Sequence, residues 1–224
     1  MGPFPHDSAP AEISAHNPMG TDGFEFVEYA HPNPAELHAL FRSMGFAPVA
    51  KHRTKAITLY RQGDINYVVN EEPGSHGANF VAKHGPCAPS MAFRVVDAKH
   101  AYARALELGA EPADPKDGGK TLDVPAIKGI GGSLLYFVET YGAKGSCYDA
   151  EFEWTGARDP KPFGVGLYYL DHLTHNVQRG RMDVWAGFYE RLFNFRQIRF
   201  FDIEGKLTGL KSRALTSPCG QIRI

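Results

Sequence analysis

The sequence lacks the features of a secreted, membrane or nucleic-acid-binding protein. It holds only 3 cysteines in 224 residues and no CxxC pair, a usage that indicates reduced thiols and a cytoplasmic location. Its formal net charge is -1 and it contains no dense block of Lys and Arg, so it offers no basic surface for nucleic acid. No apolar run approaches the length of a membrane span. We therefore expect a globular protein with neither nucleic acid nor a membrane as a partner.

The first residues also lack the parts of a signal peptide. They read MGPFPHDSAPAEISAHNPMG, with neither a charged start nor an apolar stretch. Because proline, alanine and small polar residues dominate, we expect residues 1–19 to form a disordered tail. The rest of the chain has the composition of an ordinary globular protein, since 43% of the sequence is hydrophobic.

Three stretches of the chain repeat one pattern of strand, helix and hairpin. The first copy starts at FEFVEYA, the middle copy at SMAFRVVD and the third at LYYLDHLTHNV. The apolar face of the first predicted helix consists of Leu37, Leu40, Phe41 and Met44. The same face 148 residues later consists of Trp185, Phe188, Tyr189 and Leu192. In each copy the helix is followed by two or three strands of an antiparallel hairpin. The first copy has its turn at Gly63-Asp64, and the predicted strands of the middle copy are TLDVPAI, from residue 121, and SLLYFVE.

This repeat predicts an α+β fold built from paired βαβββ modules. A module of ~50 to 70 residues cannot bury both faces of its sheet alone. Two modules side by side would form a closed or cupped eight-stranded sheet with the helices outside. We expect the first two copies to form one complete domain over residues 20–140. A linker would follow over residues 141–164, and residues 165–224 would be the first half of a second domain.

The segment DHLTHN contains two histidines spaced three residues apart. The repeat places it on the first strand of the third module, where side chains alternate between two faces. His172 and Thr174 are therefore expected on one face, together with Asn176. His175 is expected on the other face, as a partly exposed or helix-packing histidine. The two histidines should not bind one metal ion together.

His172 stands at an expected inward, barrel-lining position of the repeat, where the other two copies have Phe24 and Met91. An imidazole where two copies have an apolar side chain indicates a ligand, and the alternative is a core or rim histidine bonded to backbone groups. One imidazole does not make a site, because a non-haem iron centre takes two histidines and one carboxylate. Glu139, at the end of a predicted strand, has no such partners, and a surface glutamate is the plainer interpretation.

Two further polar features have a functional and a structural interpretation. Ser212 alternates onto the face that would line the barrel, where it either bonds a ligand or serves the structure. The glycines of GIGG, residues 129–132, join two predicted strands and do not open a helix. That context favours a hairpin turn over a phosphate-binding loop.

Several segments closely resemble bacterial 4-hydroxyphenylpyruvate dioxygenases, in the same order and with similar spacing. They include LYRQGDINYVVNEEP, HGPCAPSMAFRV, VPAIKGIGG and LDHLTHNVQRGRMDVWAGFYERLFNF. The resemblance runs from about Asn17 to the last residue and covers roughly the first two-thirds of the family's length. It implies the vicinal oxygen chelate fold, whose paired βαβββ modules would account for the repeat.

The resemblance also implies an Fe(II) enzyme of tyrosine and phenylalanine catabolism. Such an enzyme converts 4-hydroxyphenylpyruvate and O2 to homogentisate and CO2, so the expected partners are a small 2-oxo acid and oxygen. By position, His172 matches the first iron ligand of the family, and Thr174 and Ser212 match positions of the substrate pocket. The family's second histidine and its glutamate have no counterpart here. We therefore expect iron to be absent from this chain or weakly bound, and the chain alone to have little activity.

Two alternatives remain open. The first is hydroxymandelate synthase, which resembles the dioxygenase in substrate and iron site but hydroxylates another position. The second is a non-catalytic binding or oligomerising module. The unpaired third copy would expose apolar surface and open strand edges, and both favour a homo-oligomer.

Overall fold

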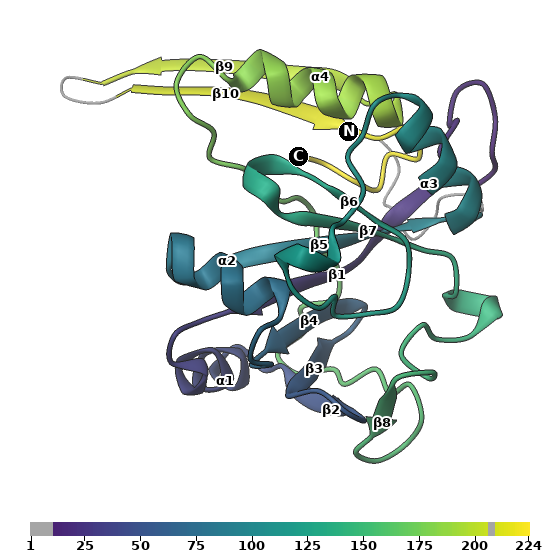
Figure 1. Cartoon of the computed structure of the whole chain (residues 1–224), viewed down its shortest axis with the longest axis vertical. Coiled ribbons are helices and arrows are strands. Elements are labelled where there is room, and N and C mark those ends of the chain that lie inside the picture. The colour runs from purple at the N-terminus through teal and green to yellow at the C-terminus, as the bar shows by residue number, and fades with distance from the viewer. Residues whose placement is uncertain (1–10, 206–208) are drawn as a thin grey trace.

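The computed structural model describes residues 11–205 and 209–224 (Figure 1). Its first strands are β1 (Thr21–Ala30), β2 (Ala47–His52), β3 (Ile57–Gln62), β4 (Ile65–Asn70) and β5 (Cys87–Val95). They are followed by β6 (Ala126–Lys128), β7 (Leu134–Val138), β8 (Phe152–Trp154), β9 (Arg196–Glu204) and β10 (Gly209–Thr216). The α-helices are α1 (Pro34–Ser43), α2 (His76–His84), α3 (Ala98–Glu107) and α4 (Met182–Phe193).

Eight of these strands form one mixed sheet in the order β6-β7-β5-β1-β4-β3-β2-β8. At its centre β1 pairs antiparallel with β5, and these are the first strands of the first two repeat copies. On the two sides of this pair, β4 runs parallel to β1 and β7 runs parallel to β5. The first two copies therefore join as paired modules, and the α+β class predicted from the repeat is confirmed.

The helices begin and end close to where the sequence predicts. Pro34 opens α1, and Gly45, with a φ of +83°, follows its end. The predicted apolar face of α1 is only partly correct. Phe41 is buried, but Leu40 is 50% exposed and Met44 is 36% exposed. The Phe41 ring packs against Tyr29 and fills the contact between α1 and the sheet. The rest of the predicted face therefore stays at the surface.

Three buried hydrophobic clusters pack on the sheet. One lies under α3 and α4, another contains Phe26 and Tyr136, and the third contains Phe41 of α1 and Tyr60 of β3. Helix α4 belongs to the third repeat copy, yet the ring of Phe193 contacts Phe93 and Phe137 of the large sheet, with ring centroids 5.4 and 6.1 Å apart. The third copy therefore shares a core with the sheet formed by the first two.

Parts of the chain expected to be tail or linker are ordered. Met19 is fully buried, and the Asn17 side chain forms three hydrogen bonds with Thr21, so the expected tail is wrong for residues 11–19. Residues 1–10 of that tail lie outside the described residues. Within the expected linker, β8 pairs with β2 and becomes the eighth strand of the sheet. The sequence predicted a linker here because the segment is rich in glycine and proline, and a strand of three residues is too short to show a pattern.

The segment between the two modules also differs from expectation. The sequence predicts no helix between β4 and β5, yet α2 forms there, and Ser75 accepts a hydrogen bond from the Ala78 backbone. The strand predicted from residue 121 begins only at Ala126. The glycines of residues 129–132 lie in the connection between the antiparallel strands β6 and β7, so the hairpin interpretation is confirmed. Among the described residues, no helix has both the length and the apolar character to cross a membrane.

Candidate functional site

The DHLTHN segment does not form the predicted strand. Residues 167–178 adopt no regular secondary structure. The described part of the chain supplies this stretch with few backbone partners, including the bond from Leu173 N to Arg223 O at 3.1 Å. A strand needs a hydrogen-bonded neighbour along its length, and neither of the two described sheets includes this segment.

The predicted alternation of side chains is nevertheless present. The exposed side chains are His172, Thr174 and Asn176, and the half-buried ones are Leu173, His175 and Val177. The half-buried set faces the core that α4 covers, because Leu173 packs against that core and His175 contacts the helix. The two histidines therefore lie on opposite sides of the segment, as the spacing predicted.

His175 packs against α4. Its Nε2 lies 2.9 Å from the Tyr189 hydroxyl, and the two rings are stacked with centroids 5.9 Å apart. Burial lowers the pKa of His175 to about 4, so the ring is neutral at physiological pH. The interpretation of His175 as a helix-packing histidine agrees with this position.

His172 points to solvent, with 58% of its side chain exposed. Its Nδ1 lies 2.8 Å from Asp171 Oδ2, and the other oxygen of that carboxylate accepts a hydrogen bond from Arg223. In residues 11–205 and 209–224 there is no group of three or more His, Cys, Asp or Glu side chains that could hold a metal ion. The described residues therefore do not assemble the ligand set that Fe(II) takes, and His172 stands without a second ligand.

Thr174 and Ser212 line the same groove. The groove has a volume of about 850 Å³ and lies between the 174–180 segment, α4 and the β9–β10 hairpin. Ser212 is half-buried on β10, opposite Phe201 of β9. His172 is not among the residues that line the groove. The fold thus brings two of the three predicted site residues together and leaves the third on the neighbouring outer surface.

The counterparts of His172 do not face the interior that the sequence comparison assigned to them. Phe24 and Met91 both lie in the core under α3 and α4, whereas Phe26 lies in the core on the other face. On β1 a bulge separates Phe24 from Phe26. From Phe24 to Phe26 β1 advances two residues, while β5 advances only one, from Phe93 to Ala92. The extra residue, Glu25, is buried among polar side chains.

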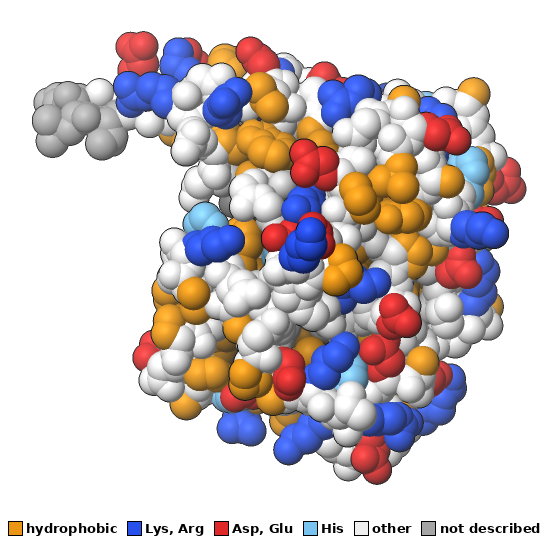
Figure 2. All heavy atoms as spheres, in the orientation of Figure 1, with side chains coloured by type: hydrophobic (Ala, Val, Ile, Leu, Met, Phe, Trp, Pro, Cys, Tyr) orange, Lys and Arg blue, Asp and Glu red, His pale blue; other side chains and the backbone are white. Residues whose placement is uncertain are grey.

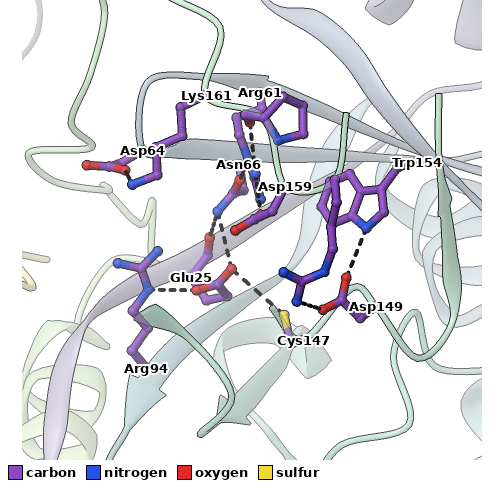
Figure 3. A network of polar contacts seen from close by, with 12 residues as sticks. Glu25, Arg61, Asp64, Asn66, Arg94, Cys147, Asp149, Trp154, Asp159 and Lys161 are labelled. Carbon is purple, nitrogen blue, oxygen red and sulfur yellow. Dashed lines mark hydrogen bonds and ion pairs between the residues drawn. The ribbon is translucent and has the colours of Figure 1, made fainter. Parts of the chain in front are cut away.

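Glu25 is the centre of a buried polar network (Figure 3). It is 5% exposed, and its Oε2 accepts a hydrogen bond from Arg94 Nε at 2.6 Å. Asn66 donates to the backbone and side-chain oxygens of Glu25, and Asn66 Oδ1 accepts a bond from Arg61. The Cys147 thiol contacts Glu25 at 3.8 Å, and burial raises its pKa well above the usual value. The sequence did not predict this network, although a charged residue inside the strand FEFVEYA was a signal for it.

Glu139 has a structural role. Its Oε2 accepts a hydrogen bond of 2.6 Å from the backbone N–H of Ala98, the first residue of α3. A carboxylate at this position satisfies a free N–H group and interacts favourably with the helix dipole. Glu139 is thus a surface glutamate after the end of β7, as the sequence favoured, and it also caps α3.

Comparison with known proteins decides the family. Residues 15–153 match the family model described as hydroxyphenylpyruvate dioxygenase, N-terminal. The chain belongs to the hydroxyphenylpyruvate dioxygenase family. This shows the relationship that the motifs predicted, and with it the vicinal oxygen chelate fold.

Relatives within and around this family are longer than the chain. The chain is 58% identical over 217 residues to hemolysin VllY of Vibrio vulnificus, covering 95% of the chain and 60% of that protein. It is 54% identical to 4-hydroxyphenylpyruvate dioxygenase of Pseudomonas aeruginosa, covering 97% and 61%. A solved xylose isomerase-like TIM barrel/4-hydroxyphenylpyruvate dioxygenase fusion protein superposes with a TM-score of 0.77 at 37% identity, covering 96% and 33%. The chain thus spans about three fifths of the curated relatives it matches.

Proposed function

We propose that this chain provides the N-terminal domain and the first catalytic module of a 4-hydroxyphenylpyruvate dioxygenase. Such an enzyme uses Fe(II) and O2 to convert 4-hydroxyphenylpyruvate to homogentisate and CO2. The similarity to the Pseudomonas aeruginosa dioxygenase carries the proposal, because it extends over nearly the whole chain. The domain division at residues 20–140 and 165–224 belongs to this proposal, with β8 of the segment between them joining the sheet of the first domain.

Three residues have proposed roles in that enzyme. His172 would be one iron ligand, which its exposed imidazole permits because its hydrogen bond to Asp171, at 2.8 Å, uses Nδ1 and leaves Nε2 without a hydrogen-bond partner among the described residues. A histidine that bonds a carboxylate through one nitrogen presents the other to a metal in a fixed orientation. Thr174 and Ser212 would contact the substrate, and their position in one groove of about 850 Å³ supports this.

The remaining ligands would have to come from outside the described residues. The described residues contain no group of three or more His, Cys, Asp or Glu side chains that could hold a metal ion, so they do not supply a complete iron site. As an isolated 224-residue chain the protein should bind Fe(II) weakly and turn over slowly or not at all. The free thiols of Cys87, Cys147 and Cys219 are consistent with a reducing compartment, and we propose the cytoplasm.

Hydroxymandelate synthase is the alternative enzyme. It would use the same 2-oxo acid and O2, and the three proposed residues do not separate the two reactions. The high identity to a dioxygenase favours homogentisate formation. The product of the reaction, identified by chromatography against both standards, distinguishes the two enzymes.

A self-associating binding module is the second candidate, and one observation favours it. The β9–β10 hairpin exposes a set of large apolar side chains, Ile198, Phe200, Phe201, Ile203 and Leu210. Figure 2 shows hydrophobic side chains at the surface in the region of this hairpin and α4. Exposed apolar patches of this kind mark interaction sites. Sedimentation of the purified chain over a concentration series measures whether a homo-oligomer forms.

A chimaera tests the enzymatic proposal. This chain replaces the corresponding part of the Pseudomonas aeruginosa dioxygenase, and the relative's remaining residues are fused after Ile224. We expect Fe(II) binding and homogentisate formation. His172→Ala should lower kcat/KM by at least about 100-fold and lower the iron content, because even the loss of a residue that orients a metal ligand costs 10–100-fold.

His175→Gln is the matched control in the same chimaera. It should keep bound iron, since His175 contacts Tyr189 on the opposite side of the segment. A folded chimaera in which His172→Ala retains full iron content and activity would overturn the assignment of His172. A folded, iron-loaded chimaera that forms another product would overturn the proposed reaction.

A further inference from the structure

A second, smaller cavity lies beside the Glu25 network. Its volume is about 150 Å³, and it is bordered by β1, the β3–β4 turn, Arg94 of β5 and residues 168–170. A cavity of about 150 Å³ holds one benzene-sized molecule. We propose that this cavity binds a small carboxylate about the size of benzoate, with the Arg94 guanidinium as its anchor. This site lies outside the groove that contains Thr174 and Ser212.

The Nε atom of Arg94 holds the guanidinium in place, and Nη1 and Nη2 remain available to a ligand. Nε donates to Glu25 at 2.6 Å, and the guanidinium carbon lies 5.4 Å from the centre of the Tyr141 ring. Neither Nη1 nor Nη2 forms a hydrogen bond to another described residue, and 27% of the side chain is exposed. Figure 3 shows these two nitrogens on the side away from the Glu25 carboxylate. A planar guanidinium with two free nitrogens suits a carboxylate, which it binds through two parallel bonds.

The acidic side chains that line the cavity already have cationic partners. Glu25 bonds Arg94, and Asp64 forms an ion pair with Lys161. Asn66, the remaining polar residue of that wall, uses its amide on Glu25 and Arg61. Arg94 carries five N–H donors and can therefore bridge Glu25 and a ligand carboxylate. The guanidinium is thus the group in this wall that offers unused donors to an anion.

The rest of the cavity border includes apolar side chains. Phe24, Ile65 and Leu170 are among the residues that line it. Tyr169 also lines it, and its hydroxyl donates a hydrogen bond to the Gln221 carbonyl at 2.9 Å, which holds this side chain in position. Burial raises the pKa of Tyr169 to about 12, so this hydroxyl stays protonated at neutral pH. A charged anchor with apolar side chains beside it suits a carboxylate attached to a small apolar group.

The test is a titration of the whole 224-residue chain with sodium benzoate, followed by NMR of backbone amides. Benzamide serves as the neutral probe of equal size, and acetate as the charged probe without a ring. We expect saturable shifts confined to the amides around Glu25, Asn66, Arg94 and Tyr169. Benzoate should bind at least about tenfold more tightly than either benzamide or acetate, which corresponds to about 1.4 kcal/mol.

Two variants separate the anchor from the fold. Arg94→Lys keeps a cation beside Glu25 but removes the planar fork, and should weaken benzoate binding several-fold. The double variant Glu25→Gln, Arg94→Gln keeps a neutral hydrogen-bonding pair and should abolish the preference for benzoate over benzamide. Arg158→Gln is the control, because it breaks an exposed ion pair with Asp149 elsewhere and should leave binding unchanged.

Three results would overturn the proposal. One is an absence of shifts at these amides in the folded wild-type chain. Another is equal binding of benzoate and benzamide, which would mean that the guanidinium makes no contribution. The third is undiminished benzoate binding by both Arg94 variants, with circular dichroism showing that each is folded.

Discussion

Strands β3 and β9 belong to modules with the same sequence pattern but lie in opposite surroundings. Every residue of β3 is buried, whereas every described residue of β9 is exposed. The difference does not come from composition, because β9 contains Ile198, Phe200, Phe201 and Ile203. Strand β3 lies between β2 and β4 in a sheet covered on both faces, while β9 pairs with β10 alone. In this fold the side chains of a strand are therefore buried when its module pairs with another module, and not because of the strand's composition alone.

Hydrogen exchange should show the largest contrast between the two regions. Amides of β5 lie at the centre of the large sheet and should exchange only through global unfolding, which typically costs about 5–15 kcal/mol. Amides of β9 should exchange through local opening, with protection at least about 1,000-fold lower. Exchange followed by mass spectrometry or NMR measures both. Leu215 of β10 is the internal control, because it is 3% exposed and bonded to Ile224, and should stay protected.

Equal protection of β9 and β5 would break the comparison. It would mean that the hairpin face is covered in solution, and protection that rises with protein concentration would identify a second copy as the cover.

Removing an aromatic ring should be costly in the shared core and inexpensive on the hairpin. Phe193→Ala should lower the free energy of unfolding by about 3–5 kcal/mol, because the ring is fully buried against Phe93 and Phe137. Phe200→Ala is the matched change on β9, where the ring is 47% exposed, and should cost below about 0.5 kcal/mol. Urea denaturation measures both. A small loss for Phe193→Ala would contradict the shared core between α4 and the large sheet.

Ion pairs should follow the same order with smaller effects. Arg94→Ala leaves the buried Glu25 carboxylate without its cation and should destabilise the protein by about 2–3 kcal/mol. Lys211→Ala breaks a pair with Asp202 on the exposed hairpin and should cost below about 0.5 kcal/mol. The comparison is made by urea denaturation at low and high salt. Equal losses for the two variants would mean that Glu25 is reached by solvent.

The smallest expected effect is a pH dependence that comes from His175. Its pKa in the folded protein, about 4, lies below the ordinary value of 6.5, so protonation favours the unfolded chain. The folded state is therefore most favoured above pH 6.5, and stability is lost as the pH falls from 6.5 towards 4. Between pH 6.5 and 5.5 the loss should be roughly 1 kcal/mol.

Two variants isolate this contribution from that of the carboxyl groups. His175→Gln should flatten the stability profile between pH 6.5 and 5.5, whereas His172→Asn on the exposed side should leave its slope unchanged. A profile of the His175→Gln variant parallel to that of the wild type would show that the imidazole is already accessible to water.

The modular fold could be predicted because its signals are local. Apolar spacing located α1 and α4, and the Gly63–Asp64 turn located the β3–β4 hairpin. Helix α2 and strand β8 were missed for a different reason. The first has no counterpart in the other copies, and the second is three residues long and depends on β2 for its hydrogen bonds. Elements that exist through tertiary pairing leave little trace in single-sequence periodicity.

In the candidate site, too, local features could be predicted and features that depend on tertiary pairing could not. Alternation placed His172 and His175 on opposite sides, which required only the geometry of an extended chain. The absence of a regular strand around His172 depends on which neighbours are present, and spacing does not contain that information. The Glu25–Arg94 pair depends on the register between β1 and β5, so arithmetic on the repeat assigned Phe24 to the wrong face.

The bulge in β1 has an evolutionary consequence. Duplicated modules are usually compared by substitution, yet here a difference of one residue in strand length decides which side chains reach the interior. A single-codon insertion or deletion at such a strand exchanges an apolar face for a polar one while the surrounding pairs stay in place. Two copies of a module can then diverge through one insertion or deletion, by which one copy acquires a salt-bridged interior such as that of Glu25 and Arg94.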